Sequence, residues 1–212
     1  MNKVVYGIII ASIATIASAQ STQLKFTGMD LNNADIVTVS LNGQQDTVYA
    51  GALSFRGSNN LSFNSYCADL ASTLNSHYHT YNESSTAPNP NTSLNLAGSI
   101  VADNFSSATT ADQQAGLQLA VWSAIYDNGS SFEYNQGSFQ LNSVSAGNEA
   151  QIKSFAQEYY SAGMNHPSSA LYFNTEANGG QSQLTPEAVP APSSLLFCAF
   201  GAAGLLIRRK RS

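Results

Sequence analysis

The sequence predicts one domain of the α+β class, with antiparallel β-strands, a central helical segment and a closing strand. Apolar and polar residues alternate in several segments before residue 70, as in half-buried strands. Between residues 94 and 163 the apolar residues instead recur every three or four positions, which indicates helices. Because 43% of the 212 residues are hydrophobic, the chain can form the core of one ordinary domain.

The strands are expected in the first third of the domain and at its end. Their expected ranges are 24–26, 36–41, 47–55, 61–67 and 171–173. Asn42-Gly43 predicts a turn between the second and the third of these strands. Residues 82–93 are mostly Asn, Pro, Ser and Thr, so they predict an exposed loop.

Three helices are expected between these strands. The apolar spacing predicts a short helix over 94–101, a longer one over 111–126 and a third from about 152 to Gly163. Thr110 and Gln113 match a capping box at the start of the long helix, and Asn128-Gly129 predicts its end. The polar segment 179–188 predicts a linker that follows the exported domain of residues 20–178.

The charge pattern excludes one large class of partner. Only 10% of the residues are charged, against roughly 25% in an average soluble protein. Residues 20–190 contain 3 basic and 13 acidic side chains, a net charge of −10. Such a segment repels phosphate backbones, so we expect no nucleic-acid partner. The sequence contains no zinc-type Cys/His spacing, and neither a metal nor a cofactor is predicted.

The first nineteen residues predict a secretory signal peptide. Lys3 provides the positive start, and residues 4–16 form an apolar stretch. Ala17-Ser18-Ala19 is a small-residue cleavage site, so signal peptidase is expected to release a chain that begins at Gln20. The protein is therefore expected to leave the cytoplasm.

The last residues, 189–212, form a second three-part segment. Val189-Pro190-Ala191-Pro192 precedes the apolar residues 195–207, and four basic residues follow at 208–211. Thirteen residues span about 20 Å as a helix, less than the ~30 Å hydrocarbon core. This tail resembles the PEP-CTERM sorting segment of Gram-negative bacteria, with alanine where the usual motif has glutamate. The resemblance implies passage through the inner membrane, recognition by an exosortase-like membrane protease, and a place at the cell surface, often alongside exopolysaccharide.

Two side chains of the exported domain are candidates for chemistry. Cys67 is its only cysteine, since Cys198 lies in the tail. Gln118 lies on the apolar face of the long helix beside Trp122, the only tryptophan of the chain. Cys67 is either a small buried hydrophobe, an intermolecular disulfide partner or a covalent group. Gln118 is either a core amide bound to a loop backbone or part of that covalent site.

The segments around both residues, within about 45–130, resemble bacterial thioester domains of surface adhesins. The resemblance rests on Tyr66-Cys67-Ala68-Asp69-Leu70 and Leu117-Gln118-Leu119-Ala120-Val121-Trp122, with Leu117 where the family has threonine. It implies an internal thioester between the Cys67 thiol and the Gln118 acyl group. The aromatic residues Tyr66, Trp122 and Tyr126 are expected to exclude water from it. The side chains of Cys67 and Gln118 should then lie close enough to touch, with Gln118 and Trp122 both turned inward.

Other sites are less well supported by the sequence. His77 and His79 share one face of a strand but have no third ligand of known spacing for copper or zinc. Cys67 with either histidine could form a protease pair, although no nucleophile motif surrounds it. Asp127 and Glu133 could pair for glycoside hydrolysis, although a turn separates them.

The sequence therefore predicts a non-enzymatic protein of the cell surface or extracellular matrix. It is expected to accompany exopolysaccharide or biofilm, with anchoring in the inner membrane through residues 195–207 as one outcome. The alternative is a covalent adhesin that acylates amines or hydroxyls, that is, nucleophiles on a target surface, through Cys67 and Gln118. A sugar-binding module is a third possibility, because tyrosines and asparagines suit carbohydrate contacts.

Overall fold

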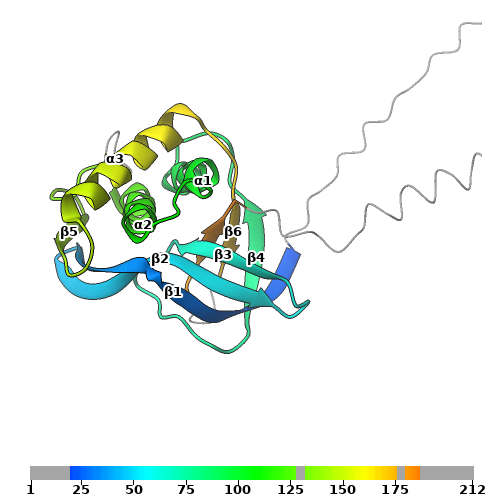
Figure 1. The fold of residues 1–212 in the computed structure, drawn as a ribbon. Coiled ribbons are helices and arrows are strands. Elements are labelled where there is room, and N and C mark those ends of the chain that lie inside the picture. Colours follow the sequence, from blue (N-terminus) through cyan, green and yellow to red (C-terminus); the bar gives the residue numbers. More distant parts are fainter. Residues whose placement is uncertain (1–19, 128–131, 176–179, 187–212) are drawn as a thin grey trace, which may run out of the picture.

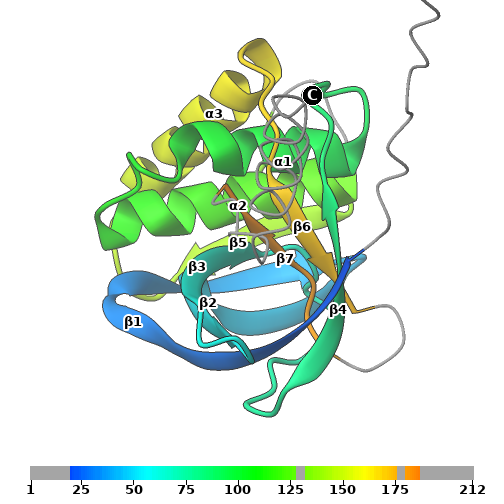
Figure 2. The same cartoon turned by 90° about the vertical axis from the view of Figure 1, so that its right-hand side faces the viewer.

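The computed structural model describes residues 20–127, 132–175 and 180–186. These residues confirm the α+β class, because an antiparallel sheet is combined with three helices. Figures 1 and 2 show the three helices packed together on one side of the strands. The predicted signal helix, the C-terminal hydrophobic helix and the Asn128-Gly129 stop lie outside the described residues.

Seven strands are described. They are β1 (Gln20–Leu41), β2 (Gln44–Gly57), β3 (Ser62–Cys67), β4 (His79–Ser85), β5 (Phe139–Val144), β6 (Leu171–Asn174) and β7 (Gln183–Thr185). The predicted turn at Asn42-Gly43 is confirmed, with φ angles of 53° and 81°. The left-handed backbone of both residues matches the tight hairpin that joins β1 to β2.

Six of the described strands close into a ring. The sheet runs β2-β3-β7-β6-β4-β1-β5, and β1 also pairs with β2. All these pairings are antiparallel. β1 closes the ring because its length lets it pair with β4, with β2 and, at its far end, with β5. The separate strands predicted at 24–26 and 36–41 are thus one strand, interrupted by irregular register between Phe26 and Gly28 and between Met29 and Ala34.

Two predictions about polar segments were wrong. Residues 82–85, expected in a loop, belong to β4, which is hydrogen-bonded between β1 and β6. Residues 183–185, expected in the linker 179–188, form β7, which lies between β3 and β6. The polar side chains of β7 are buried but bonded: Gln183 Oε1 accepts a hydrogen bond from Ser65 Oγ at 2.9 Å. Asn82, Ser84 and Ser85 of β4 are exposed. These segments are strands because they pair with strands that are distant in sequence, and the polarity of their own residues does not indicate this pairing.

The three helices confirm the helical prediction. They are α1 (Ser93–Asn104), α2 (Ala111–Asp127) and α3 (Glu149–Asn165), which ends two residues beyond Gly163. The capping box at the start of α2 is present. The Gln113 N–H donates to Thr110 Oγ1 at 3.3 Å, and the Thr110 N–H donates to Gln113 Oε1 at 3.0 Å.

Helix α2 is the centre of the domain and carries the candidate site. Its residues from Ala115 to Ala124 are all buried, so every face of this stretch meets protein. On one side Gly116 lets the helix approach α3 closely, since a Cβ there would lie 2.7 Å from Phe155 Cβ. Polar side chains on such a helix cannot reach water and must find partners inside the protein. Within the described ranges no helix is long and apolar enough to cross a membrane.

Candidate functional site

The site begins where β2 and β3 separate. The two strands pair from Arg56↔Ser62 to Leu53↔Ser65, and the same register, continued by two residues, would pair Gly51 with Cys67. The described pairing of β2 with β3 ends before Gly51, which pairs only along its other edge, with Ala34 of β1. Cys67, the last residue of β3, therefore has main-chain polar groups that β2 does not satisfy on this side.

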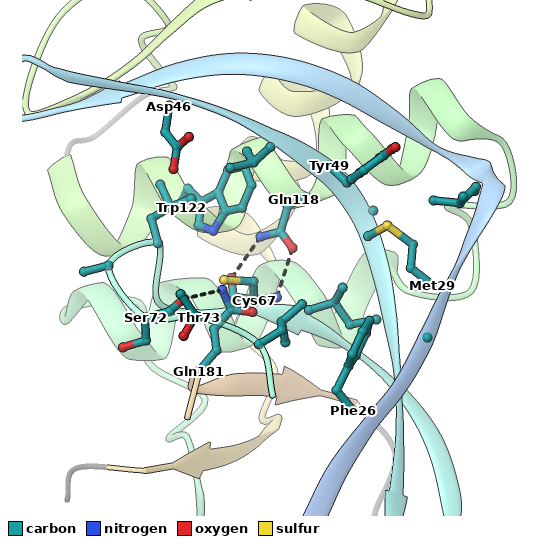
Figure 3. A pocket seen from close by; sticks show the side chains of 18 residues that line it. Phe26, Met29, Asp46, Tyr49, Cys67, Ser72, Thr73, Gln118, Trp122 and Gln181 are labelled. Carbon is teal, nitrogen blue, oxygen red and sulfur yellow. Dashed lines mark hydrogen bonds between the residues drawn. The ribbon is translucent and has the colours of Figure 1, made fainter. Parts of the chain in front are cut away.

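The side chain of Gln118 takes the place of the missing strand. Its Oε1 accepts a hydrogen bond from the Cys67 N–H at 2.9 Å, and its Nε2 donates to the Cys67 carbonyl oxygen at 2.9 Å. Gln118 is only 1% exposed. Gln118 thus contacts the main chain of Cys67, whereas the contact between the two side chains stays a prediction. The predicted inward orientation of Gln118 and Trp122 is confirmed, since both are buried. Figure 3 shows this pair of hydrogen bonds beside the Trp122 ring.

A second glutamine of α2 binds the main chain of β2. Gln114 lies one helical turn before Gln118, and its Oε1 accepts a hydrogen bond from the Ala52 N–H at 3.1 Å. Sequence reasoning missed Gln114. The spacing of four residues between two glutamines on one face of a helix is the signal that could have found it.

The Cys67 thiol is buried and locally bonded. Its side chain donates to the Asp69 carbonyl oxygen at 3.1 Å, and the Asp69 N–H approaches Sγ at 3.3 Å. Burial raises the pKa of Cys67 from 9.0 to about 12. At neutral pH Cys67 is therefore a thiol rather than a thiolate, and a reaction at sulfur must remove this proton as it proceeds.

Cys67, Gln118 and Trp122 line a pocket of about 680 Å³. Its walls are mainly apolar side chains from β1, β2 and the loop that follows β3; they include Phe26, Met29, Leu31, Val48, Tyr49, Leu53, Leu70 and Leu74. Leu31 and Tyr49 are 62% and 50% exposed, so they belong to the rim. Asp46 is the only charged residue of this lining. The described walls thus give the site apolar surroundings.

The three aromatic residues predicted to shield the site have different positions. Trp122 lines the pocket, and its ring packs on Phe139 with centroids 5.9 Å apart. Its indole N–H makes no hydrogen bond of ordinary geometry within the described residues, but it lies close enough to the Cys67 sulfur to lower the thiol pKa slightly against the larger effect of burial. Tyr126 Oη accepts from the Leu70 N–H at 2.8 Å and so holds the loop after Cys67. Tyr66 does not line the pocket; its ring packs edge-on against Phe105.

The hydrogen bond from the Cys67 N–H to Gln118 Oε1 has a chemical consequence. If sulfur attacked the amide carbon, negative charge would develop on Oε1. A donor already fixed at 2.9 Å from that oxygen would stabilise this charge without rearrangement, as in an oxyanion hole.

The other candidate residues are not brought into a comparable site. His77 Nδ1 lies 2.8 Å from Asn75 Oδ1, and no group of three potential metal ligands occurs among the described residues. Asp127 Oδ1 accepts from the main-chain N–H groups of Ser138 and Phe139, so this carboxylate fixes the loop before β5. These contacts are structural.

Comparison of the chain with protein-family models, with curated proteins and with solved structures finds no match. The geometry of the pocket and its hydrogen bonds is therefore what bears on function.

Proposed function

We propose that this chain is an exported surface protein that attaches covalently to a target through an internal thioester between Cys67 and Gln118. The observation that carries the proposal is the Gln118 amide, held by two hydrogen bonds on Cys67 and lining an apolar pocket together with it. Fifty-one residues separate the two in sequence. Their meeting is therefore a product of the fold.

The proposed chemistry has two steps. First, the Cys67 sulfur attacks the Gln118 amide carbon, the C–N bond breaks, and the thiol proton leaves with the amide nitrogen as ammonia. Later, an amine or hydroxyl of the target attacks the same carbon, the C–S bond breaks, and sulfur takes a proton. The target is then joined to Gln118 by an amide or ester bond, and Cys67 is a free thiol again. Each chain reacts once, so the protein is not an enzyme in this proposal.

The pocket supports both the formation and the survival of such a bond. Because the Cys67 N–H faces Oε1, it favours attack at the amide carbon. Cys67 and Gln118 are 3% and 1% exposed, so bulk water has little access to the amide carbon of Gln118. The pocket that both residues line gives a target group a way to it.

The route to the surface rests on the sequence. Residues 1–19 resemble a signal peptide, and residues 189–212 resemble a PEP-CTERM sorting tail. We propose that signal peptidase and an exosortase-like protease process the chain in the inner membrane of a Gram-negative bacterium. The domain would then be displayed at the cell surface or in an exopolysaccharide matrix.

A second candidate function has its own supporting observation. The Gln118 amide already satisfies both main-chain groups of Cys67, and burial keeps the thiol protonated. The same contacts therefore suit a passive matrix protein in which Gln118 only completes the edge of β3.

Methylamine distinguishes the two candidates. The exported protein is incubated with methylamine, digested and mapped by mass spectrometry. Covalent attachment predicts N-methylglutamine at position 118 and an alkylatable thiol at Cys67, both absent from Cys67→Ser. Unmodified Gln118 in the native wild type would support the passive candidate instead.

A further inference from the structure

The first half of α2 contacts β2 at the point where the pairing of β2 with both of its neighbouring strands, β1 and β3, is interrupted. Register between β1 and β2 passes from Met29↔Leu53 to Ala34↔Gly51, which leaves Ala52 without a partner residue on β1. The Ala52 N–H instead donates to Gln114 Oε1 at 3.1 Å. Ala52 is the residue next to Gly51, where β2 turns away from β3.

The separation of β2 from β3 has a definite alternative. If β2 stayed with β3 for two more residues of the existing register, Ala52 would pair with Tyr66 and the peptide of Gly51 with Cys67. The Gly51 peptide would then occupy the place in which the Gln118 amide now lies. Two partners thus compete for the Cys67 main chain, a strand residue and a helix side chain.

Gln114 favours the pairing of Cys67 with the Gln118 side chain over its pairing with the Gly51 peptide. Its hydrogen bond ties β2 to α2 at Ala52, sixty-two residues away in sequence. Gln114 and Gln118 are on the same face of α2, since four residues make about one helical turn. The hydrogen bond of Gln114 fixes the position of β2. It therefore also fixes the gap between β2 and β3 that the Gln118 side chain occupies.

We infer that Gln114 is a positioning residue that holds β2 away from β3, so that the Gln118 amide rather than the Gly51 peptide pairs with Cys67. The inference rests on the proposed thioester, because its consequence is the placement of the reacting amide. Gln114 itself does not line the pocket and is not expected to touch the target.

Two substitutions separate positioning from general packing. Gln114→Met keeps the length of the side chain and removes the acceptor, whereas Gln114→Glu keeps an acceptor for Ala52. Gln151→Met is the control, because Gln151 is an exposed residue near the start of α3. All variants are exported and purified as the wild type is, and circular dichroism confirms that they are folded.

The readout is the fraction of chains that add methylamine at Gln118. We expect Gln114→Met to lower this fraction at least several-fold, and Gln114→Glu and Gln151→Met to remain near the wild type. Equal fractions in the wild type and Gln114→Met would overturn the inference.

If the wild type itself adds no methylamine, the proposed thioester fails, and nuclear magnetic resonance then tests the positioning separately. The contact between the Gln118 side-chain amide and the Cys67 main chain should be lost in Gln114→Met and kept in Gln114→Glu. An unchanged contact in Gln114→Met would overturn the positioning role as well.

Discussion

The side chain of Gln118 pairs with both main-chain polar groups of Cys67, accepting from the N–H and donating to the carbonyl oxygen at 2.9 Å each. The pairing reproduces what a neighbouring strand would provide at the end of β3. A helix side chain therefore completes a sheet, and the same contact brings the Gln118 amide to the residue that carries the thiol. Stability and the proposed chemistry depend on one interaction.

Gln118→Ala should destabilise the domain even if no thioester forms. It leaves a buried N–H and a buried carbonyl oxygen without partners, which costs about 2–4 kcal/mol of unfolding free energy. Chemical denaturation followed by circular dichroism measures this loss, with the exposed Gln151→Ala as control. A change below about 0.5 kcal/mol, the usual range of surface substitutions, would contradict the structural role.

Gly116→Ala tests the packing of α2 on α3. A Cβ at residue 116 would lie 2.7 Å from Phe155 Cβ and 3.0 Å from the Ile152 carbonyl oxygen, so the helices must move apart. We expect a loss of about 1–3 kcal/mol in unfolding free energy. Helix propensity alone predicts the opposite sign, a gain of about 1 kcal/mol. A more stable variant in thermal denaturation would show that the close approach does not limit this packing.

Asp35 should make stability depend on pH. It is 4% exposed, its Oδ2 has no hydrogen-bond partner among the described residues, and Asp112 from the first turn of α2 faces it. Burial, and then the charge of Asp112, raise the pKa of Asp35 from 3.8 to about 6. Because the folded state binds this proton more tightly, its stabilising effect is fully present below pH 3.8 and is lost as pH rises through 6.

The substitution Asp35→Asn removes this titration. The difference in melting temperature between variant and wild type should therefore change between pH 4 and pH 7, in favour of the variant at the higher pH. Asp46→Asn, at an exposed carboxylate of β2, is the matched control. A difference in melting temperature between wild type and Asp35→Asn that stays constant across this range would refute the raised pKa of Asp35.

Much of this fold could be predicted from local pattern. The three helices, the capping box at Thr110 and the hairpin at Asn42-Gly43 all follow from residues close together in sequence. β4 and β7 could not be predicted in this way. Their polar residues become strand residues only because of their neighbours: β7, with Gln183, lies between β3 and β6, and β4 lies between β1 and β6.

The site shows the same division. Cys67 and Gln118 were found because each is unusual where it stands, a lone cysteine and an amide on an apolar helix face. Tyr66 was expected beside them, yet successive residues of a strand point to opposite faces, and its ring packs on Phe105 instead. Gln114 was missed because its function depends on the β1 irregularity opposite Ala52, which only the assembled sheet shows.

The proposed route of export predicts both ends of the mature chain. Processing by signal peptidase should yield Gln20 as the first residue, and processing by an exosortase-like enzyme should remove Arg208 to Arg211. Terminal sequencing of protein recovered from the envelope or medium tests this. A recovered chain that begins with Met1 would contradict the signal peptide, and one that keeps its basic end in the inner membrane would indicate a plain anchor.

The most direct test of the central claim is the intact mass of the freshly purified, exported protein before and after exposure to methylamine. Cys67→Ser and Gln118→Ala serve as controls that cannot form the bond. An internal thioester predicts that the native wild type gains the mass of one methylamine and then exposes one titratable thiol, while neither control gains mass. A wild type whose mass does not change, with a Cys67 thiol that reacts only after denaturation, would contradict the thioester.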